Sequence, residues 1–429
     1  MKVLVIGSGG REHAIVWKLT QSPRVSRVYC APGNAGVAQI AECVSVPVKG
    51  DFAEIRNWVR DNGIALTFIG PEDPLANGIV DAFETDGLRV FGPRKAAAQL
   101  EADKIYAKDF MREAGIPTGA ARYFDRSAPA LEYLKTLEPP YVIKAAGLAA
   151  GKGVVVAATW AEAERAVRDS LDSAVFGEAG RRILIEEYLR GEEASVLAFT
   201  DGHTVLPMPS AQDHKAVFDG DKGPNTGGMG AYSPAPVVTP ELEREIRETI
   251  LQRTVDGMRR RGILYKGVLY AGLMIGPSGP KVIEFNCRFG DPEAQPLLLR
   301  LDTDLVDIAE AVIDGRLREI AVGWRAEPAV CVVIASGGYP GAYEKGKPIE
   351  GLDQTGENDS AVVFHAGTAQ RDGRTVTNGG RVLGVTALGP SLENAIERAY
   401  SICRKVRFEG AHYRRDIGRK ALNRLVQKQ

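Results

Sequence analysis

The chain contains 429 residues, of which 44% are hydrophobic, and its 54 basic and 55 acidic side chains leave a formal net charge of -1. This length exceeds what one hydrophobic core usually supports, and it predicts two to four domains. A near-zero net charge without a clustered run of Lys and Arg argues against nucleic-acid binding, because that function needs concentrated positive charge.

The sequence also argues against a membrane protein. No segment reaches the roughly 18 consecutive apolar residues of a membrane-spanning helix, so we expect no membrane partner and a cytoplasmic location. The apolar run at residues 3–6 stops at Gly7, too early for a signal peptide, and is expected to form a buried strand. Five scattered cysteines without a Cys-x-x-Cys pair predict reduced, mostly buried thiols rather than disulfides or structural zinc.

Residues 1 to about 100 alternate short apolar runs with polar, helix-like segments. The expected strands are residues 3–6, 25–29, 66–69 and 88–91. This βαβ alternation predicts a parallel sheet, and such sheets bind ligands at the carboxyl ends of their strands. Turns that contain glycine follow three of these strands, at residues 7–10, 32–36 and 70–72.

The first of these turns, Gly7-x-Gly9-Gly10-Arg11-Glu12, departs from the dinucleotide fingerprint because Glu12 stands where the third glycine belongs. The second strand also ends without an acidic residue for a nucleotide ribose. These departures favour a small phosphate-bearing substrate at the helix N-terminus over NAD. An ordinary strand-to-helix turn explains the motif equally well, and His13 is interpreted as a local helix-terminus partner rather than a catalytic base.

A helix is expected from Ala102 to Glu113, and a strand at residues 141–144 opens a new domain. The following segment, residues 144–153, resembles a phosphate loop. It is not a Walker A loop, because only three residues separate Gly147 from Gly151 and Gly153 stands where Ser or Thr is needed. Its backbone N–H groups, with Lys144 and Lys152, are nevertheless suited to phosphate binding. A plain glycine-rich hairpin is the alternative.

The middle of the chain contains a long segment rich in Gly, Pro and Asn, at residues 220–236, directly after Gln212-Asp213-His214-Lys215. Long irregular segments in compact chains are usually functional, so we interpret this one as a mobile lid or substrate loop. A solvated connector is the alternative. A helix is expected next, at residues 240–261, and two strands at residues 267–275 and 281–286 form an expected hairpin.

The second strand of that hairpin carries Glu284 and Asn286, which stand two residues apart and therefore project from the same face. Two oxygen donors with positions left for substrate phosphates match the coordination of Mg²⁺. Arg288, Asp291 and Glu293 follow closely, which favours a metal site over an ordinary polar face on an edge strand. After this hairpin, apolar runs at residues 329–335, 361–367 and 380–388 predict a separate, strand-rich unit.

Taken in order, six motifs resemble the phosphoribosylamine–glycine ligase family (glycinamide ribonucleotide synthetases) of the ATP-grasp superfamily, across essentially the whole chain. They are Gly9-Gly10-Arg11-Glu12-His13, Ala31-Pro32-Gly33-Asn34-Ala35-Gly36, residues 147–154, residues 223–234, residues 284–293 and Val376-Thr377-Asn378-Gly379-Gly380-Arg381. Two positions depart from the family pattern. Ala146 stands where relatives often have a small polar residue, and Asp103 where serine is common.

The resemblance implies an α/β and α+β multidomain protein with an ATP-grasp fold. It implies a Rossmann-like, parallel-sheet pre-ATP-grasp domain at residues 1–102 that binds 5-phosphoribosylamine. Residues 103–190 would form the ATP-grasp subdomain with the phosphate loop and adenine hinge. Residues 191–322 would form the ATP-grasp core with the lid and metal strand, and residues 323–429 a β-rich C-terminal domain.

The resemblance also implies a role for individual residues. ATP would be contacted by Lys104, Lys144, Gly151, Lys152, Gly153, an adenine hinge of Glu186, Glu187, Tyr188 and Leu189, and the ribose-binding Glu193. Magnesium, or manganese in its place, would be held by Glu284 and Asn286. The other substrates would contact Gly9, Gly10, Asn34, Glu72, His214, Asn225 and Arg288. The catalytic set would be Lys144, Asp213, Lys215, Arg288 and Asp291.

By this resemblance, the carboxylate of glycine attacks the γ-phosphate of ATP, and the amine of 5-phosphoribosylamine then attacks glycyl phosphate to form an amide. A monomer or weak dimer is expected. Three alternatives stay open: a carboxylating or other amine ligase with the same ATP machinery, a nicotinamide dehydrogenase based on the first βαβ unit, and a non-catalytic nucleotide sensor. ATP consumption that depends on bicarbonate would identify the first alternative, and NAD binding the second. ATP binding without ADP release would identify the third.

Overall fold

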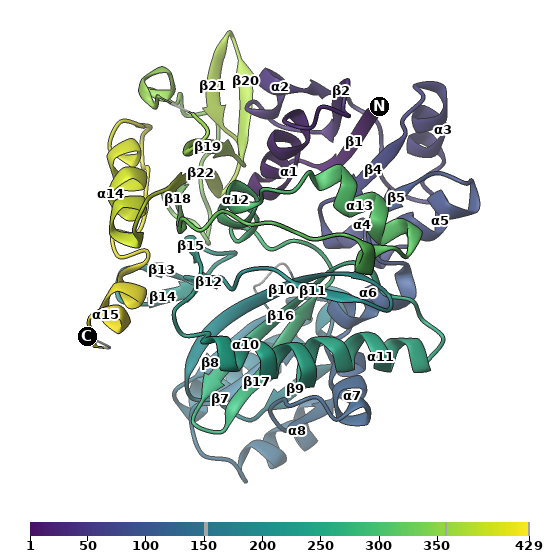
Figure 1. The fold of residues 1–429 in the computed structure, drawn as a ribbon. Helices are drawn as coiled ribbons and strands as arrows, with labels where there is room; N and C mark the ends of the chain where they lie inside the picture. The colour runs from purple at the N-terminus through teal and green to yellow at the C-terminus, as the bar shows by residue number, and fades with distance from the viewer. Residues whose placement is uncertain (150–152, 357, 428–429) are drawn as a thin grey trace.

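The computed structural model describes residues 1–149, 153–356 and 358–427. Its N-terminal part is a five-stranded parallel sheet (Figure 1). Its strand order is β3-β2-β1-β4-β5, as the βαβ alternation predicts. The strands are β1 (Lys2–Gly7), β2 (Arg27–Pro32), β3 (Glu42–Cys43), β4 (Leu66–Ile69) and β5 (Val90–Phe91). The helices are α1 (Gly10–Thr20), α2 (Val37–Ile40), α3 (Ala53–Asp61), α4 (Glu72–Ala76), α5 (Ile79–Thr85) and α6 (Lys95–Ala102).

The central strand β1 is apolar at four consecutive positions and buried on both faces, which is why its sequence does not alternate. The next helix, α7 (Lys104–Ala114), leads out of this domain. Asp103 caps it by accepting hydrogen bonds from the backbone N–H groups of Ile105 and Tyr106. The unusual Asp103 therefore suits its place as a helix cap, and Gly115 ends the helix in the left-handed conformation.

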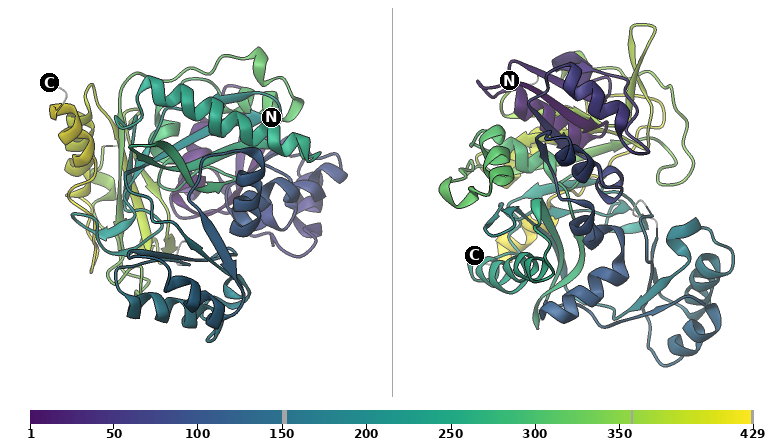
Figure 2. Two further views of the ribbon diagram at one scale, coloured as in Figure 1. Left: turned by 90° about the horizontal axis from the view of Figure 1, so that it is seen from below. Right: turned by 90° about the vertical axis from the view of Figure 1, so that its right-hand side faces the viewer.

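A four-stranded antiparallel sheet of order β6-β9-β7-β8 follows. Its elements are β6 (Ala121–Phe124), α8 (Ser127–Leu134), β7 (Tyr141–Ala145), β8 (Val154–Ala157), α9 (Trp160–Leu171), η1 (Gly177–Gly180) and β9 (Ile183–Glu186). The helices α8 and α9 pack with the sheet around a small core of its own. The right-hand view of Figure 2 shows this blue unit standing out from the rest of the molecule.

A second four-stranded antiparallel sheet has the order β11-β10-β16-β17. Its strands are β10 (Glu192–Asp201), β11 (Val205–Pro207), β16 (Lys266–Gly276) and β17 (Gly279–Asn286). The associated helices are α10 (Pro240–Ile246), the π-helical η2 (Arg247–Leu251), α11 (Gln252–Arg260), α12 (Ala294–Arg300), α13 (Leu305–Asp314) and η3 (Leu317–Glu319). The predicted hairpin is confirmed as β16 and β17, and the predicted helix is confirmed as the continuous run from α10 to α11.

The C-terminal sheet has the order β12-β15-β18-β22-β19 and is covered by α14. The elements of this region are β12 (Gln212–Asp213), β13 (Ala216–Phe218), β14 (Lys222–Asn225), β15 (Gly230–Ser233), β18 (Ala329–Ala335), η4 (Leu352–Gln354), β19 (Ala361–His365), β20 (Thr368–Arg371), β21 (Arg374–Thr377), β22 (Arg381–Leu388), α14 (Leu392–Cys403) and α15 (Arg419–Gln427). The prediction that residues 220–236 are irregular is wrong for β14 and β15, because partner strands impose a pairing that glycine-rich sequence does not signal.

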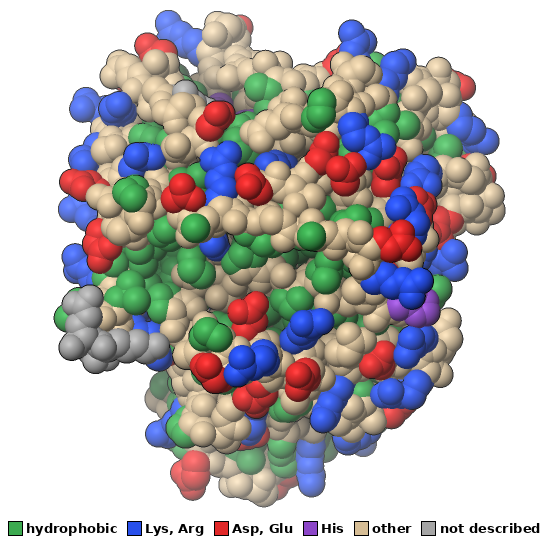
Figure 3. Space-filling model, in the orientation of Figure 1, with side chains coloured by type: hydrophobic (Ala, Val, Ile, Leu, Met, Phe, Trp, Pro, Cys, Tyr) green, Lys and Arg blue, Asp and Glu red, His purple; other side chains and the backbone are tan. Residues whose placement is uncertain are grey.

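Along the described residues no helix combines the length and apolar character needed to cross a bilayer. The face in Figure 3 intersperses basic and acidic side chains. All five cysteines are free thiols and only Cys43 is exposed, as the sequence predicts.

Candidate active site

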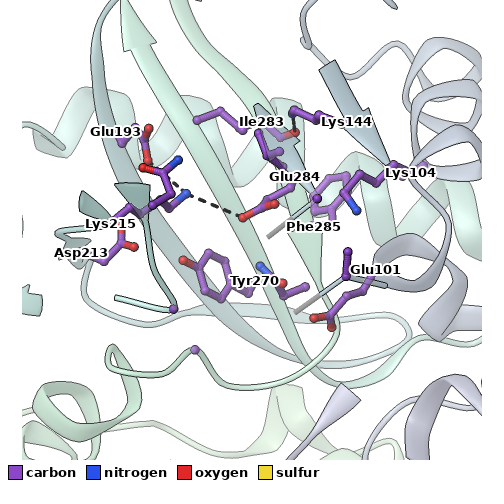
Figure 4. A pocket seen from close by; sticks show the side chains of 18 of the residues that line it. Glu101, Lys104, Lys144, Glu193, Asp213, Lys215, Tyr270, Ile283, Glu284 and Phe285 are labelled. Atoms are coloured by element: carbon purple, nitrogen blue, oxygen red, sulfur yellow. Dashed lines mark hydrogen bonds and ion pairs between the residues drawn. The ribbon is translucent and has the colours of Figure 1, made fainter. Parts of the chain in front are cut away.

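A cavity of about 450 Å³ is bounded by the two antiparallel four-stranded sheets, the N-terminal domain and part of the C-terminal region (Figure 4). Its volume falls in the range of about 300–1,000 Å³ typical of small-molecule sites. The predicted site residues that line it are Glu72, Lys104, Lys144, Gly153, Glu186, Glu187, Tyr188, Leu189, Glu193, Asp213, Lys215, Asn225, Glu284, Asn286, Arg288 and Asp291. Segments far apart in the sequence thus bring most of the predicted residues around one space.

A β-bulge in β17 lies directly before the proposed metal ligands. The register with β16 shifts between Glu284 and Val282, which leaves Ile283 without a partner in the ladder. The extra residue interrupts the alternation of side chains, and beyond it Glu284 and Asn286 both line the cavity. The carbonyl of Ile283 accepts a hydrogen bond from Lys144 Nζ at 3.2 Å.

Lys108 lines the cavity, but its ammonium group is fully used by the protein. An ammonium group has three N–H donors. Those of Lys108 reach Glu186 Oε2 at 3.2 Å, Thr118 Oγ1 at 2.8 Å and Gly119 O at 3.1 Å. Lys108 is therefore a structural cation that holds the start of the predicted adenine hinge.

Lys144 and Lys104 keep donors for a ligand. Lys144 Nζ lies 2.9 Å from Glu186 Oε2 and donates to the Ile283 carbonyl, and Lys104 Nζ donates to the Gly147 carbonyl at 3.0 Å. Counted over the described residues, one donor of Lys144 and two of Lys104 stay without a protein partner. Burial lowers the pKa of Lys104, while the nearby carboxylate of Glu284 opposes that shift. Both lysines therefore keep N–H donors that are available to phosphate oxygens.

Lys215 lies between two carboxylates of the cavity. Its Nζ is 3.1 Å from Glu193 Oε2 and 3.7 Å from Glu284 Oε1 (Figure 4). Burial alone would raise the pKa of Glu284, but the positive charges of Lys215 and Lys144 outweigh burial and lower that pKa. Glu284 therefore stays ionised at neutral pH, in the form that binds a cation.

Asp213 is an acidic residue of the cavity with a strongly raised pKa. Burial raises the pKa of Asp213 to about 7; the charge of Lys215 opposes this shift and the neighbouring Glu293 adds to it. Glu293 is itself fixed by hydrogen bonds from Tyr270 at 2.5 Å and Ser195 at 3.2 Å. A carboxyl group with a pKa near 7 can accept or release a proton at physiological pH.

Arg288 is held at the end of the cavity next to the N-terminal domain. Its Nε lies 3.1 Å from Glu72 Oε2, and its Nη2 lies 2.6 Å from Glu101 Oε1 and 3.2 Å from Asn286 Oδ1. Glu101 also accepts hydrogen bonds from the N–H and thiol of Cys287 at 2.7 and 3.1 Å. The guanidinium direction is therefore fixed before any substrate binds, and Glu72 already has one oxygen engaged with Arg288.

The carboxylate of Glu12 fills the first glycine-rich turn. It accepts hydrogen bonds from the Gly9 N–H and from Arg11 Nε, each at 2.5 Å. A Cβ atom at Gly7 or Gly70 would lie 2.5 or 2.2 Å from side-chain atoms of Glu12, so a larger residue at either position would displace this carboxylate. A dinucleotide pyrophosphate would meet this negative charge where it requires free N–H donors. The arrangement argues against the dehydrogenase alternative.

Four predicted substrate contacts, Gly9, Gly10, Asn34 and His214, are not among the residues that line the cavity. The Gly9 N–H is already bonded to Glu12, so the phosphate contact predicted for this donor has no support in this geometry. Asn34 Nδ2 donates to two backbone carbonyls, one in each terminal domain, at 2.8 Å. His214 is buried, and neither of its ring nitrogens is hydrogen-bonded to any residue that the structure describes. Gly151 and Lys152 lie outside the described residues.

Sequence reasoning missed several cavity-lining side chains, among them Arg11, Glu101, Lys108 and Arg381. Lys108 stands one helical turn after Lys104, a spacing that places both on one face of α7 and was available as a signal. Arg11 and Arg381 stand inside recognised motifs, yet their contacts depend on tertiary structure. Glu101 is identified by its contacts with Arg288 and Cys287, which also depend on tertiary structure.

The oxygen pair of Glu284 and Asn286 fits a magnesium ion that is shared with a nucleotide. Mg²⁺ is usually bound by one or two carboxylates together with substrate phosphates and water. Within the described part of the chain, no group of three or more His, Cys, Asp or Glu side chains could hold a metal ion by itself. Binding at this pair would therefore depend on the phosphates of the nucleotide.

The paired antiparallel sheets and the lysine- and glutamate-lined cavity between them define an ATP-grasp protein. The biotin carboxylase domain of the 2-oxoglutarate carboxylase from Hydrogenobacter thermophilus, solved with MgADP, ADP and bicarbonate, has the same fold. Its TM-score is 0.74, over 96% of this chain and 91% of that one, at 18% sequence identity. This likeness concerns the fold alone.

Within this class, the chain belongs to the phosphoribosylglycinamide synthetase family. The family's N domain matches residues 1–101, its ATP-grasp (A) domain residues 102–294 and its C domain residues 329–420. The phosphoribosylamine–glycine ligase of Pseudomonas aeruginosa is 53% identical over 425 residues, 99% of each chain, and that of Vibrio parahaemolyticus is 52% identical over 431 residues, 100% of each. The crystal structure of the Thermotoga maritima enzyme is 35% identical, with a TM-score of 0.82 over 97% of this chain and 100% of that one.

Proposed function

We propose that this protein ligates glycine to 5-phosphoribosylamine at the expense of ATP, giving glycinamide ribonucleotide, ADP and phosphate in purine biosynthesis. The observation that carries the proposal is the meeting of three kinds of group in one cavity. These are cations with free donors, an oxygen pair suited to magnesium, and a fixed arginine beside that pair. The full-length likeness to proteins named phosphoribosylamine–glycine ligase supports the choice of substrates.

On the ATP side, phosphoryl transfer requires positioning and positive charge more than covalent participation by the protein. We assign the phosphate contacts to Lys104, Lys144 and the segment of Gly151, Lys152 and Gly153. Residues 186–189 would bind the adenine, and Glu193 the ribose hydroxyls. Bound at Glu284 and Asn286, Mg²⁺, or Mn²⁺ with the same oxygen ligands, would neutralise charge on the phosphates.

On the acyl side, the carboxylate of glycine attacks the γ-phosphorus and ADP leaves, giving glycyl phosphate. The amine of 5-phosphoribosylamine then forms the C–N bond, the C–O bond to phosphate breaks, and the amine loses a proton. Arg288 would bind the glycine carboxylate, and Asp213 would accept the proton, a role that its pKa of about 7 supports. Enclosure of the cavity protects an acyl phosphate from water.

Several broader assignments belong to this proposal. The chain would divide into functional units at residues 1–102, 103–190, 191–322 and 323–429, with the first unit contributing Glu72 to the ribose site of the amine substrate. We also propose that the enzyme acts in the cytoplasm as a monomer or weak dimer.

The decisive experiment is an ADP-release assay with MgATP, glycine and freshly prepared 5-phosphoribosylamine, omitting each substrate in turn. We expect ADP release to require glycine and an amide product to appear only when the amine is added. ADP release that ignores glycine but requires bicarbonate would instead assign a carboxylating ligase, and ATP binding without ADP release under any combination would assign a sensor.

A further inference from the structure

Arg381, the first residue of β22, connects three parts of the chain at the edge of the cavity. Its Nη1 donates to the Gly227 carbonyl at 2.6 Å and to the Asp291 carbonyl at 2.5 Å, and its Nη2 lies 3.3 Å from Asp291 Oδ2. All three residues line the cavity. The guanidinium of Arg381 thus connects the C-terminal sheet to the glycine-rich segment before β15 and to the segment that follows β17.

The C-terminal region holds both ends of this connection. The carbonyl of Arg381 accepts a hydrogen bond from the Gly367 N–H at 2.9 Å, and the N–H of Gly227 donates to the hydroxyl of Tyr339 at 2.9 Å. A planar guanidinium on an anchored backbone loses little freedom when it forms its hydrogen bonds. The link is therefore prearranged by the fold.

Asp291 is fixed from two sides. Gln295 Nε2 donates to Oδ1 at 2.9 Å, and Arg381 approaches Oδ2. Burial would raise the pKa of Asp291, but the charges of Arg381 and Arg11 outweigh it and lower the pKa. Without Arg381, a buried carboxylate would lose its nearest cation, which is a costly arrangement that favours reorientation.

We propose that Arg381 is a positioning residue for the acyl half of the reaction. It fixes the Asp291 carboxylate and the Gly227 carbonyl, so that docking of the C-terminal domain completes the site for glycine and the amine. This inference rests on the proposed function and deepens it. It assigns a task to the last of the six motifs, which ends at Arg381.

Three variants test the proposal. Arg381→Met removes the guanidinium. Gly227→Ala keeps the charge but adds a Cβ 3.0 Å from Arg381 Cζ, which must move the guanidinium, at a position where the backbone is not in the left-handed region. Arg424→Met is the matched control, because it removes another ion pair of the C-terminal region, to Glu192, without touching the cavity lining.

The steady-state constants for all three substrates, the Kd for MgATP by calorimetry and thermal unfolding are measured on each variant. Misplacing reacting groups by about 1 Å can cost about 10²-fold, so we expect kcat/KM for glycine to fall by about 10²-fold in Arg381→Met and by about tenfold in Gly227→Ala. Arg424→Met should lose less than about twofold, and the Kd for MgATP should stay within about threefold throughout.

A double-variant cycle distinguishes positioning from a general structural role. If Arg381 acts through Asp291, adding Arg381→Met to Asp291→Asn should cost less than about threefold more in kcat/KM for glycine. Three results would overturn the inference. They are fully additive losses in kcat/KM for glycine in the double variant, a loss in Arg381→Met no larger than that in Arg424→Met, and a loss in Arg381→Met that is confined to MgATP binding. Should Arg381→Met fail to fold, Gly227→Ala and its double with Asp291→Asn decide the question. Absence of glycine-dependent ADP release in the unmodified enzyme would refute the proposed function, whereas an active enzyme indifferent to Arg381 would refute only this inference.

Discussion

Replacement of Lys144 by methionine tests the ATP half of the site most directly. The change removes the ammonium but keeps an unbranched apolar stem, and Glu186 still has Lys108 at 3.2 Å as a cationic partner. Removing one preorganised charged donor from a phosphoryl-transfer site commonly costs about 10² to 10³ in rate, or roughly 3–4 kcal/mol. We expect kcat for glycine-dependent ADP release to fall by that amount in Lys144→Met.

Lys108→Met is the matched control, because it removes a second cation from the same carboxylate. All three donors of Lys108 bind protein atoms, so its loss should lower the melting temperature yet reduce kcat by less than about tenfold. Both variants are compared by coupled ADP release and thermal unfolding. A loss below about threefold in Lys144→Met, or equal losses in the two variants, would refute the assignment of Lys144 to the phosphates.

Three other changes have defined outcomes. Glu284→Ala should lower kcat by about 10²-fold and raise the Mg²⁺ concentration for half-maximal activity, without a large change in melting temperature; normal turnover at ordinary Mg²⁺ contradicts the metal assignment. Because folding raises the pKa of Asp213 to about 7, its stabilising contribution is complete below an unfolded pKa of about 3.9 and is lost as pH rises through 7. Asparagine does not titrate, so the melting temperature of Asp213→Asn should rise relative to that of the unmodified protein as the pH is raised. A difference in melting temperature that does not change with pH would exclude the raised pKa. Glu12→Ala should lower the free energy of unfolding by about 1–2 kcal/mol in urea titrations, since α1 loses its cap; unchanged stability would show that the carboxylate is dispensable.

Local periodicity accounts for the parts of the fold that the sequence predicted. Short apolar runs between helix-like segments identified β1 and β4, and the hairpin of β16 and β17 was visible as two runs around a turn. Pairing between distant strands was not predictable. The segment of β15 is rich in glycine and small residues, and its pairing with β12 on one side and with β18, far along the chain, on the other is what places it in a sheet.

For the site, too, the sequence predicted the types of residue but not their contacts. Residue type and spacing selected Lys144 and Glu284, because a phosphate site needs cations and a magnesium site needs oxygens. Which donors are already satisfied is a tertiary property, so the sequence could not separate Lys108, which has no donor left, from Lys104. It likewise could not show that Glu12 occupies the turn that was expected to receive a phosphate.

The ATP half and the acyl half that we propose for the site are built by different parts of the chain. The lysines and oxygen donors of the ATP half come from the two antiparallel sheets and α7, whereas the fixed groups of the acyl half depend on contacts with both terminal regions. Glu72 and Glu101 orient Arg288 from one side, and Arg381 orients Asp291 from the other. Since an acyl phosphate must be shielded from water while the amine arrives, closure by two separate domains suits the second step more than the first. Disturbing the arginine contacts should therefore impair use of glycine and amine more than binding of ATP.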